Sequence, residues 1–134
     1  MVGFVVVSHS KALAEETIRL ALEMKYSEFP LVNGSGTEGD YFGSNPLIIK
    51  EAIEKAYTEE GVLIFVDLGS SVLNTQIAMD FLDRDEYKLE NIKIADAPLV
   101  EGLIAAVAMN DTKATLEDIL LELKEFKNFS KIND

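Results

Sequence analysis

Two short apolar runs, each followed by a polar cluster and a helical pattern, constrain the fold most strongly. Residues 3–7 and 61–66 are almost continuous in Val, Ile, Leu and Phe, which is typical of strands buried on both faces of a parallel sheet. Residues 11–24 then repeat apolar side chains at helical spacing, with charged residues between them. Alternating strands and helices predict an α/β fold: an open, mostly parallel, doubly wound sheet with right-handed crossovers and helices on both faces.

The later segments continue this alternation. Pro30 makes a central strand position awkward for its segment, so that strand is expected at an edge. Asn45 and Pro46 are the residue types preferred at an N-cap and at the first helical position. The expected sheet order is 2-1-3-4, with an added edge strand as an option. The remaining elements are expected as strands at 29–32 and 92–95, and as helices at 46–56, 72–82, 103–109 and from Thr115 onward.

Composition limits the classes of protein that this chain can belong to. Its 134 residues, 48% of them hydrophobic, suit one core, so we expect a single domain over residues 1–127 and a frayed tail over 128–134. A net charge of −12 argues against nucleic acid and anionic membranes as partners. The absence of cysteine and the single histidine argue against disulfides and against Cys or multi-His metal sites. Without a long apolar stretch or a leader, a cytoplasmic location is expected.

Polar residues follow the first and third strands of the predicted sheet. In the order 2-1-3-4 these strands are neighbours, so His9 and Asp67 are expected to lie side by side. A neutral imidazole can act as a nucleophile through one nitrogen when a carboxylate accepts the N–H of the other. Ser8, Ser10 and the amides at the start of the first helix are expected to hold phosphoryl oxygens. This pattern predicts the formation of a phosphohistidine.

Other interpretations of the same residues stay open from sequence alone. A lone histidine is often structural, and Asp67 is also a common N-cap type. Residues 33–45, which hold four of the eight glycines, form either a functional loop or a solvated connection. A receiver that is phosphorylated on Asp67 would need acidic metal ligands after the first strand, where the chain has Ser-His-Ser. A flavin module would need a phosphate cradle there, and a non-catalytic regulatory dimer is a further alternative.

Three motifs resemble one family in order and separation. They are Val5–Ser10, Asp67–Ser70 and Ala97–Gly102, and together they resemble the phosphotransfer subunit of phosphoenolpyruvate-dependent dihydroxyacetone kinase, in the mannose-type IIA superfamily of the sugar phosphotransferase system. Gly43-Ser44 is similar to the Gly-Thr of that family's loop. The glycine-rich pattern that the mannose-type branch has after the third strand is absent here, so the dihydroxyacetone kinase branch is the better match. A mannose-type sugar-transport component is the alternative.

The resemblance covers nearly the whole chain and implies a specific relay. It implies a cytoplasmic homodimer in which His9 is phosphorylated at Nε2 and Asp67 hydrogen-bonds the ring. The donor would be the phosphocarrier HPr, and the acceptor would be ADP on a nucleotide-binding kinase subunit, with no cofactor bound by this chain. Beyond the serines already named, the expected phosphoryl-binding residues are Gly36, Gly43, Ser44, Gly69 and Ser70.

Overall fold

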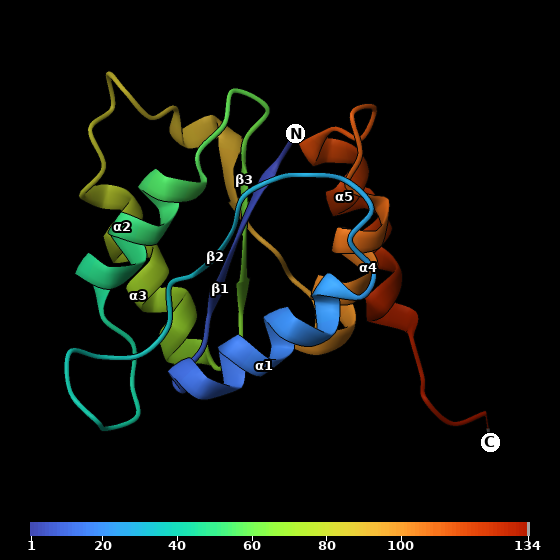
Figure 1. Cartoon of the computed structure of the whole chain (residues 1–134), viewed down its shortest axis with the longest axis horizontal. Coiled ribbons are helices and arrows are strands. Elements are labelled where there is room, and N and C mark those ends of the chain that lie inside the picture. The colour runs from blue at the N-terminus through green and yellow to red at the C-terminus, as the bar shows by residue number, and fades with distance from the viewer. Residues whose placement is uncertain (134) are drawn as a thin grey trace.

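Four parallel strands form the centre of the molecule, in the order β2-β1-β3-β4. The computed structural model describes residues 1–133 (Figure 1). Strand β1 (Gly3–Val7) lies between β2 (Leu31–Asn33) and β3 (Val62–Val66), and β3 also pairs with β4 (Ile92–Ile94). The predicted sheet and its order are therefore confirmed. No fifth strand joins the sheet within residues 1–133, so the optional edge strand is absent from the described chain.

Helices cover both faces of the sheet, as predicted (Figure 1). One layer consists of α1 (Lys11–Leu22), α4 (Leu99–Met109) and α5 (Leu116–Leu123). The other layer consists of α2 (Pro46–Ala56) and α3 (Gly69–Asp80). Two short 3₁₀ helices, Leu89–Asn91 and Lys124–Asn128, precede β4 and follow α5.

The central strands are apolar throughout because both of their faces are buried. Successive strand side chains point to opposite faces, so Phe4 and Val6 face the α1 layer while Val5 and Val7 face the α2 layer. Phe4 makes edge contacts with both Phe29 and Phe65, with ring centroids 5.3 Å apart in each case. The polar residues that follow β1 and β3 are thus attached to strands that are buried along their whole length.

Several element boundaries differ from the prediction. The strand expected at 29–32 lies at Leu31–Asn33, because Pro30 precedes it and Phe29 turns into the core; its edge position is confirmed. The first helix ends at Leu22 rather than 24. The helices expected from 72 and 103 begin earlier, at Gly69 and Leu99. Gly69 and Ser70 are exposed, so these first-turn residues carry no apolar signal for a periodicity argument to detect.

Two predicted helix starts are confirmed in detail. The Asn45 side chain accepts a hydrogen bond from the Leu47 amide at 2.8 Å, with Pro46 as the first helical residue. Thr115 and Asp118 form a reciprocal capping box at the start of α5.

The described chain contains no helix that is both long and apolar enough to span a bilayer. Residues 129–133 follow the last 3₁₀ helix without regular secondary structure. Asp134, at the end of the tail expected to fray, lies outside the described residues.

Candidate active site

The pairing of β1 with β3 sets the position of the site. Val7 pairs with Val66 in parallel register, so the residues that follow both strands emerge at the same edge of the sheet. This register brings His9 and Asp67 together, 58 positions apart in the sequence. Their side chains are 24% and 16% exposed, respectively, so the pair is shielded and still reachable from solvent.

Asp67 holds His9 through both its ring and its backbone. The distance between His9 Nδ1 and Asp67 Oδ1 is 2.9 Å, and the His9 backbone N–H donates to Asp67 Oδ2 at 2.9 Å. An ionised carboxylate at this place selects the tautomer with hydrogen on Nδ1. The Nε2 atom then keeps its electron pair and contacts the Ser70 hydroxyl. This arrangement matches the requirement for a nitrogen nucleophile.

Several donors keep the Asp67 carboxylate charged. Burial raises the pKa of Asp67, but hydrogen bonds from the His9 amide, the Ser71 hydroxyl, the Leu68 amide and the His9 ring outweigh burial and hold its pKa well below the usual range. The Ser71 and Leu68 contacts measure 2.7 and 2.6 Å. Asp67 is therefore an anion at neutral pH, able to stabilise positive charge on the imidazole.

Ser8 has a different place from the predicted one. It is fully buried, and its hydroxyl donates to Asp67 Oδ2 at 2.8 Å while accepting the Ser10 N–H at 3.0 Å. This hydroxyl supports the carboxylate from beneath and is closed to a phosphoryl group arriving from solvent. The expectation that Ser8 holds phosphoryl oxygens is therefore corrected.

Ser10 lies at the mouth of the site, as the N-cap of α1. Its Oγ accepts the Leu13 N–H at 3.1 Å, which leaves its own hydrogen available for another acceptor. A shallow hollow next to it is lined by His9, Gly36 and the loop residues up to Phe42. The site is therefore open on the side of the glycine-rich loop.

The loop after β2 is tied to the turn that carries His9 (Figure 1, lower left). Gly36 and Ser44 form an isolated bridge, the Gly43 N–H donates to the His9 carbonyl at 2.8 Å, and the Gly36 N–H donates to the Ser8 carbonyl at 3.2 Å. Gly36 has a φ of +84°, which favours glycine at this close approach. The loop is therefore attached to the turn that carries His9, which favours a functional loop over a solvated connection.

Gly69 and Ser70 form the start of α3, on the other side of His9. The first amides of a helix have no partner within the helix and attract anions. A Cβ at Gly69 would meet no atom within 4 Å, so open space lies in front of this backbone. Ser70 contacts Nε2, so the first turn of α3 lies next to the position of a group attached there.

Three side chains of the site have no place in the sequence prediction. Ser71 Oγ lies 3.1 Å from His9 Nδ1, besides donating to Asp67. Buried Ser35 accepts the Ser8 N–H at 2.8 Å, and Asn74 donates to Ser44. Ser71 and Asn74 follow Asp67 by four and seven positions, a helical spacing that could have revealed them once the earlier helix start was known. Ser35 carries no such signal.

The surroundings of Asp67 differ from those expected of a metal site or of a receiver phosphorylated on aspartate. Five donors surround the Asp67 carboxylate, namely the hydroxyls of Ser8 and Ser71, the amides of His9 and Leu68, and the His9 ring. Among residues 1–133 no cluster of His, Cys, Asp and Glu is suited to hold a metal ion. Asp67 is thus committed to the imidazole, which disfavours a receiver phosphorylated on this carboxylate.

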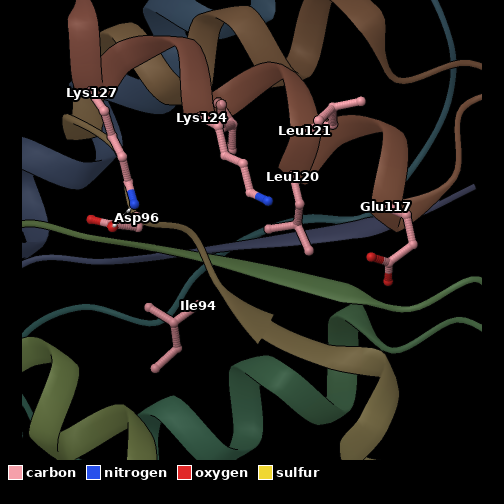
Figure 2. Close-up of a pocket in the computed structure, with 8 residues that line it drawn as sticks. Ile94, Asp96, Glu117, Leu120, Leu121, Lys124 and Lys127 are labelled. Atoms are coloured by element: carbon pink, nitrogen blue, oxygen red, sulfur yellow. Dashed lines mark ion pairs between the residues drawn. The ribbon is translucent and has the colours of Figure 1, made fainter.

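A separate groove lies between β4 and α5 (Figure 2). Ile94, Leu120 and Leu121 give it an apolar floor and rim, and Glu117 and Lys127 lie toward opposite ends. Neither His9, Asp67 nor the serines around them line it. The site around His9, at the carboxyl ends of β1 and β3, and this groove are therefore distinct surfaces.

Comparison with known proteins agrees with this geometry. Residues 3–120 match the EIIA-man family model, described as the PTS system fructose IIA component. A crystal structure of a protein of unknown function, EF1359, superposes with a TM-score of 0.83 at 30% identity and covers 98% of both chains. Both comparisons extend over nearly the whole molecule.

Two curated relatives carry the same subunit name. The PEP-dependent dihydroxyacetone kinase 2, phosphoryl donor subunit DhaM, of Listeria innocua is 34% identical over 123 residues, covering 92% of this chain and 97% of the relative. The corresponding Providencia stuartii subunit is 33% identical over 128 residues, covering 93% of this chain. This chain spans only 26% of that longer relative. The family model and these identities together show that the chain belongs to the EIIA-man family, among the DhaM-type subunits of PEP-dependent dihydroxyacetone kinases.

Proposed function

We propose that this chain is a phosphohistidine relay subunit, in which His9 Nε2 receives a phosphoryl group and passes it on. One observation carries the proposal: Nδ1 lies 2.9 Å from the ionised Asp67 carboxylate, while Nε2 faces the Ser70 hydroxyl at the open edge of the sheet. The carboxylate provides both the tautomer and the compensating charge that a nucleophilic imidazole needs. Membership of a family of phosphoryl donor subunits supports the same role.

In the proposed first step, the Nε2 electron pair attacks phosphorus on the donor. A new N–P bond forms while the bond from phosphorus to the donor's leaving nitrogen breaks, and that nitrogen keeps the electron pair. The hydrogen on Nδ1 stays in its bond to Asp67. In the second step an oxygen of ADP attacks phosphorus, and the N–P electron pair returns to Nε2. Transfers of this kind depend mainly on positioning and charge stabilisation.

The transferred group needs local hydrogen-bond donors, because the chain already carries a net charge of −12. We assign this role to the start of α3, at Gly69 and Ser70, and to the hydroxyl of Ser10. The glycine loop contributes Gly36 and Gly43 by framing the site, and Ser44 by its hydroxyl. Ser8 is left out because it is buried beneath Asp67.

We further propose that the donor is the phosphocarrier HPr and that the acceptor is ADP held on the nucleotide-binding kinase subunit. Relatives described as phosphoryl donor subunits, and one from Lactococcus lactis described as the phosphotransferase subunit of a PTS-dependent dihydroxyacetone kinase, support a place between the PTS and a kinase. These partners set the expected location in the cytoplasm. No bound cofactor is required of this chain.

We also propose that the chain forms a homodimer, and the groove between β4 and α5 supports this assembly. Strand β4 is at the edge of the sheet, where backbone groups lack a neighbouring strand, and Leu121 beside it is 65% exposed. Lys127 and Glu117 lie toward opposite ends of the groove (Figure 2), so under a twofold axis across it Lys127 of one copy, which also pairs with its own Asp96 at 3.6 Å, would approach Glu117 of the other copy. Sedimentation equilibrium of the wild type and Leu121→Glu tests this assembly, and a wild-type monomer at micromolar concentration would refute it.

Intact mass spectrometry tests the relay directly. The protein is mixed with phosphoenolpyruvate, enzyme I and HPr, in parallel with a His9→Ala variant shown to be folded by circular dichroism. We expect one acid-labile phosphoryl group on the wild type only, and its loss when the ADP-loaded kinase subunit is added. Omitting HPr is the matched control for the donor.

Other outcomes would count against particular parts of the proposal. An unmodified wild type would refute the HPr-fed relay. Modification of both proteins would move the phosphorylated residue away from His9. A phosphoryl group that persists with the ADP-loaded subunit but is lost to a sugar-transport component would identify a mannose-type acceptor instead.

A further inference from the structure

The glycine-rich loop and helix α3 approach His9 from opposite sides, and one side chain joins them. Asn74 Nδ2 donates to Ser44 Oγ at 2.6 Å and lies 3.4 Å from the Ser44 carbonyl. Asn74 stands four residues after Ser70, on the same helical face. The loop is thereby tied to the helix whose start contacts Nε2.

The same link extends to the backbone of the nucleophile. Ser44 forms the isolated bridge with Gly36, and its neighbour Gly43 donates to the His9 carbonyl at 2.8 Å. A chain of contacts therefore runs from α3 through Asn74 and the loop to residue 9. These contacts fix the distance between α3 and the glycine-rich loop, which lie on opposite sides of His9.

The direction of the Asn74 hydrogen bond has a chemical consequence. An amide NH₂ group only donates, so Ser44 Oγ is the acceptor in this contact. Its own hydrogen is left available for another acceptor. An apolar residue at position 74 could not hydrogen-bond Ser44, so the loop would lose its link to α3 and the Ser44 hydroxyl would be free to rotate.

We propose that Asn74 is a positioning residue for phosphoryl transfer, holding the Ser44 hydroxyl and the glycine loop against α3. This inference rests on the relay function proposed above and adds a residue to it. Asn74 acts through Ser44 and the loop, without itself contacting the nucleophile.

The test combines rates with a double-mutant cycle. Single-turnover phosphoryl transfer from phospho-HPr is measured for the wild type, Asn74→Ala, Ser44→Ala and the double variant, over a range of phospho-HPr concentrations. We expect a loss of about tenfold in the maximal rate for Asn74→Ala, with little change in the half-saturating concentration, because positioning is lost and docking is kept. The double variant is expected to be no slower than the slower single variant, since both residues act through one contact.

Gln76→Ala is the matched control, because Gln76 is an exposed amide on the same helix. Its transfer rate is expected to equal that of the wild type. Fully additive losses in the cycle, or an unchanged rate for Asn74→Ala, would overturn the proposal. Failure of the wild type itself to accept a phosphoryl group would instead refute the relay function.

Amide hydrogen exchange provides a second readout that does not depend on transfer. Asn74→Ala is expected to speed exchange at Gly43, whose N–H donates to the His9 carbonyl, while the strand amides of β1 stay protected. Unchanged exchange at Gly43 would contradict the proposed link even if the rate fell. If Asn74→Ala fails to fold, the transfer rate and the Gly43 exchange rate are measured for Ser44→Ala instead. Unchanged exchange at Gly43 in that variant would overturn the proposed link.

Discussion

The two ends of strands β1 and β3 are built in different ways. At the carboxyl end, hydroxyls, a carboxylate and loop amides surround His9. At the amino end, backbone packs directly on backbone, since a Cβ at Gly3 would lie 1.8 Å from the Ala56 carbonyl oxygen, and the Thr58 side-chain hydroxyl donates to the Met1 carbonyl at 2.6 Å. The amino end also has polar contacts, such as the Met1 ammonium with Glu60 and buried Asn110 with the Val2 carbonyl, but these join chain segments to one another and none reaches the histidine. The difference indicates that one end serves chemistry and the other serves stability.

The largest predicted effect concerns Asp67→Asn. A neutral amide keeps the shape but cannot compensate the positive charge that develops on the imidazole, so we expect phosphoryl transfer to slow about 100-fold. One carboxylate oxygen also becomes an NH₂ group facing donors, which lowers the free energy of unfolding. Rapid-quench transfer assays and urea denaturation measure the two effects. A variant as fast as the wild type would refute the role of the Asp67 charge.

Gly3→Ala is expected to affect stability alone. The added methyl overlaps the Ala56 carbonyl, and overpacking of this kind costs about 3 kcal/mol of unfolding free energy. Transfer per folded molecule should be unchanged, because residue 3 lies at the end of β1 that is remote from His9. A variant that stays stable but loses transfer would break the proposed division between the two ends.

Gly69→Ala is expected to do the opposite of Gly3→Ala: it should slow phosphoryl transfer without lowering stability. Its Cβ would meet no protein atom within 4 Å, and alanine favours a helix over glycine by about 0.8 kcal/mol, so thermal denaturation should show equal or higher stability. The methyl would occupy space in front of the first amides of α3, and we expect transfer to slow about threefold by misplacing the phosphoryl oxygens. Unchanged transfer would remove Gly69 from the phosphoryl-binding set.

The smallest predicted effect is the acid dependence of stability. The pKa of Asp67 is lower in the folded protein than its usual value, so ionised Asp67 stabilises the fold above about pH 4. This contribution is lost as the pH falls below that value, because the Asp67 carboxylate of the unfolded chain then binds protons more readily than that of the folded protein. The difference in unfolding free energy between the wild type and Asp67→Asn should therefore be constant from pH 8 to 5 and shrink below pH 4. A difference that grows in acid would contradict the assigned charge.

Much of the frame could be predicted from local patterns. The buried strands, their order, the Asn45 and Thr115 helix starts and the juxtaposition of His9 with Asp67 are all present as predicted. These features depend on hydrophobic periodicity and on the residues next in sequence, which the chain displays directly. The missed start of α3 at Gly69 shows the limit of this approach, because an exposed first turn has no apolar stripe.

The sequence by itself determined that a histidine and an aspartate end neighbouring buried strands. Only the tertiary structure decided which atoms of His9, Asp67 and the loop each surrounding side chain contacts. Ser70 and Ser71 are chemically identical neighbours, yet one contacts Nε2 and the other donates to Asp67. The reason is that successive helical residues point about 100° apart, and the position of α3 against β1 sets which direction meets the imidazole. Likewise, Ser8 turns under the carboxylate and Asn74 reaches Ser44 because distant segments pack there, which no local pattern encodes.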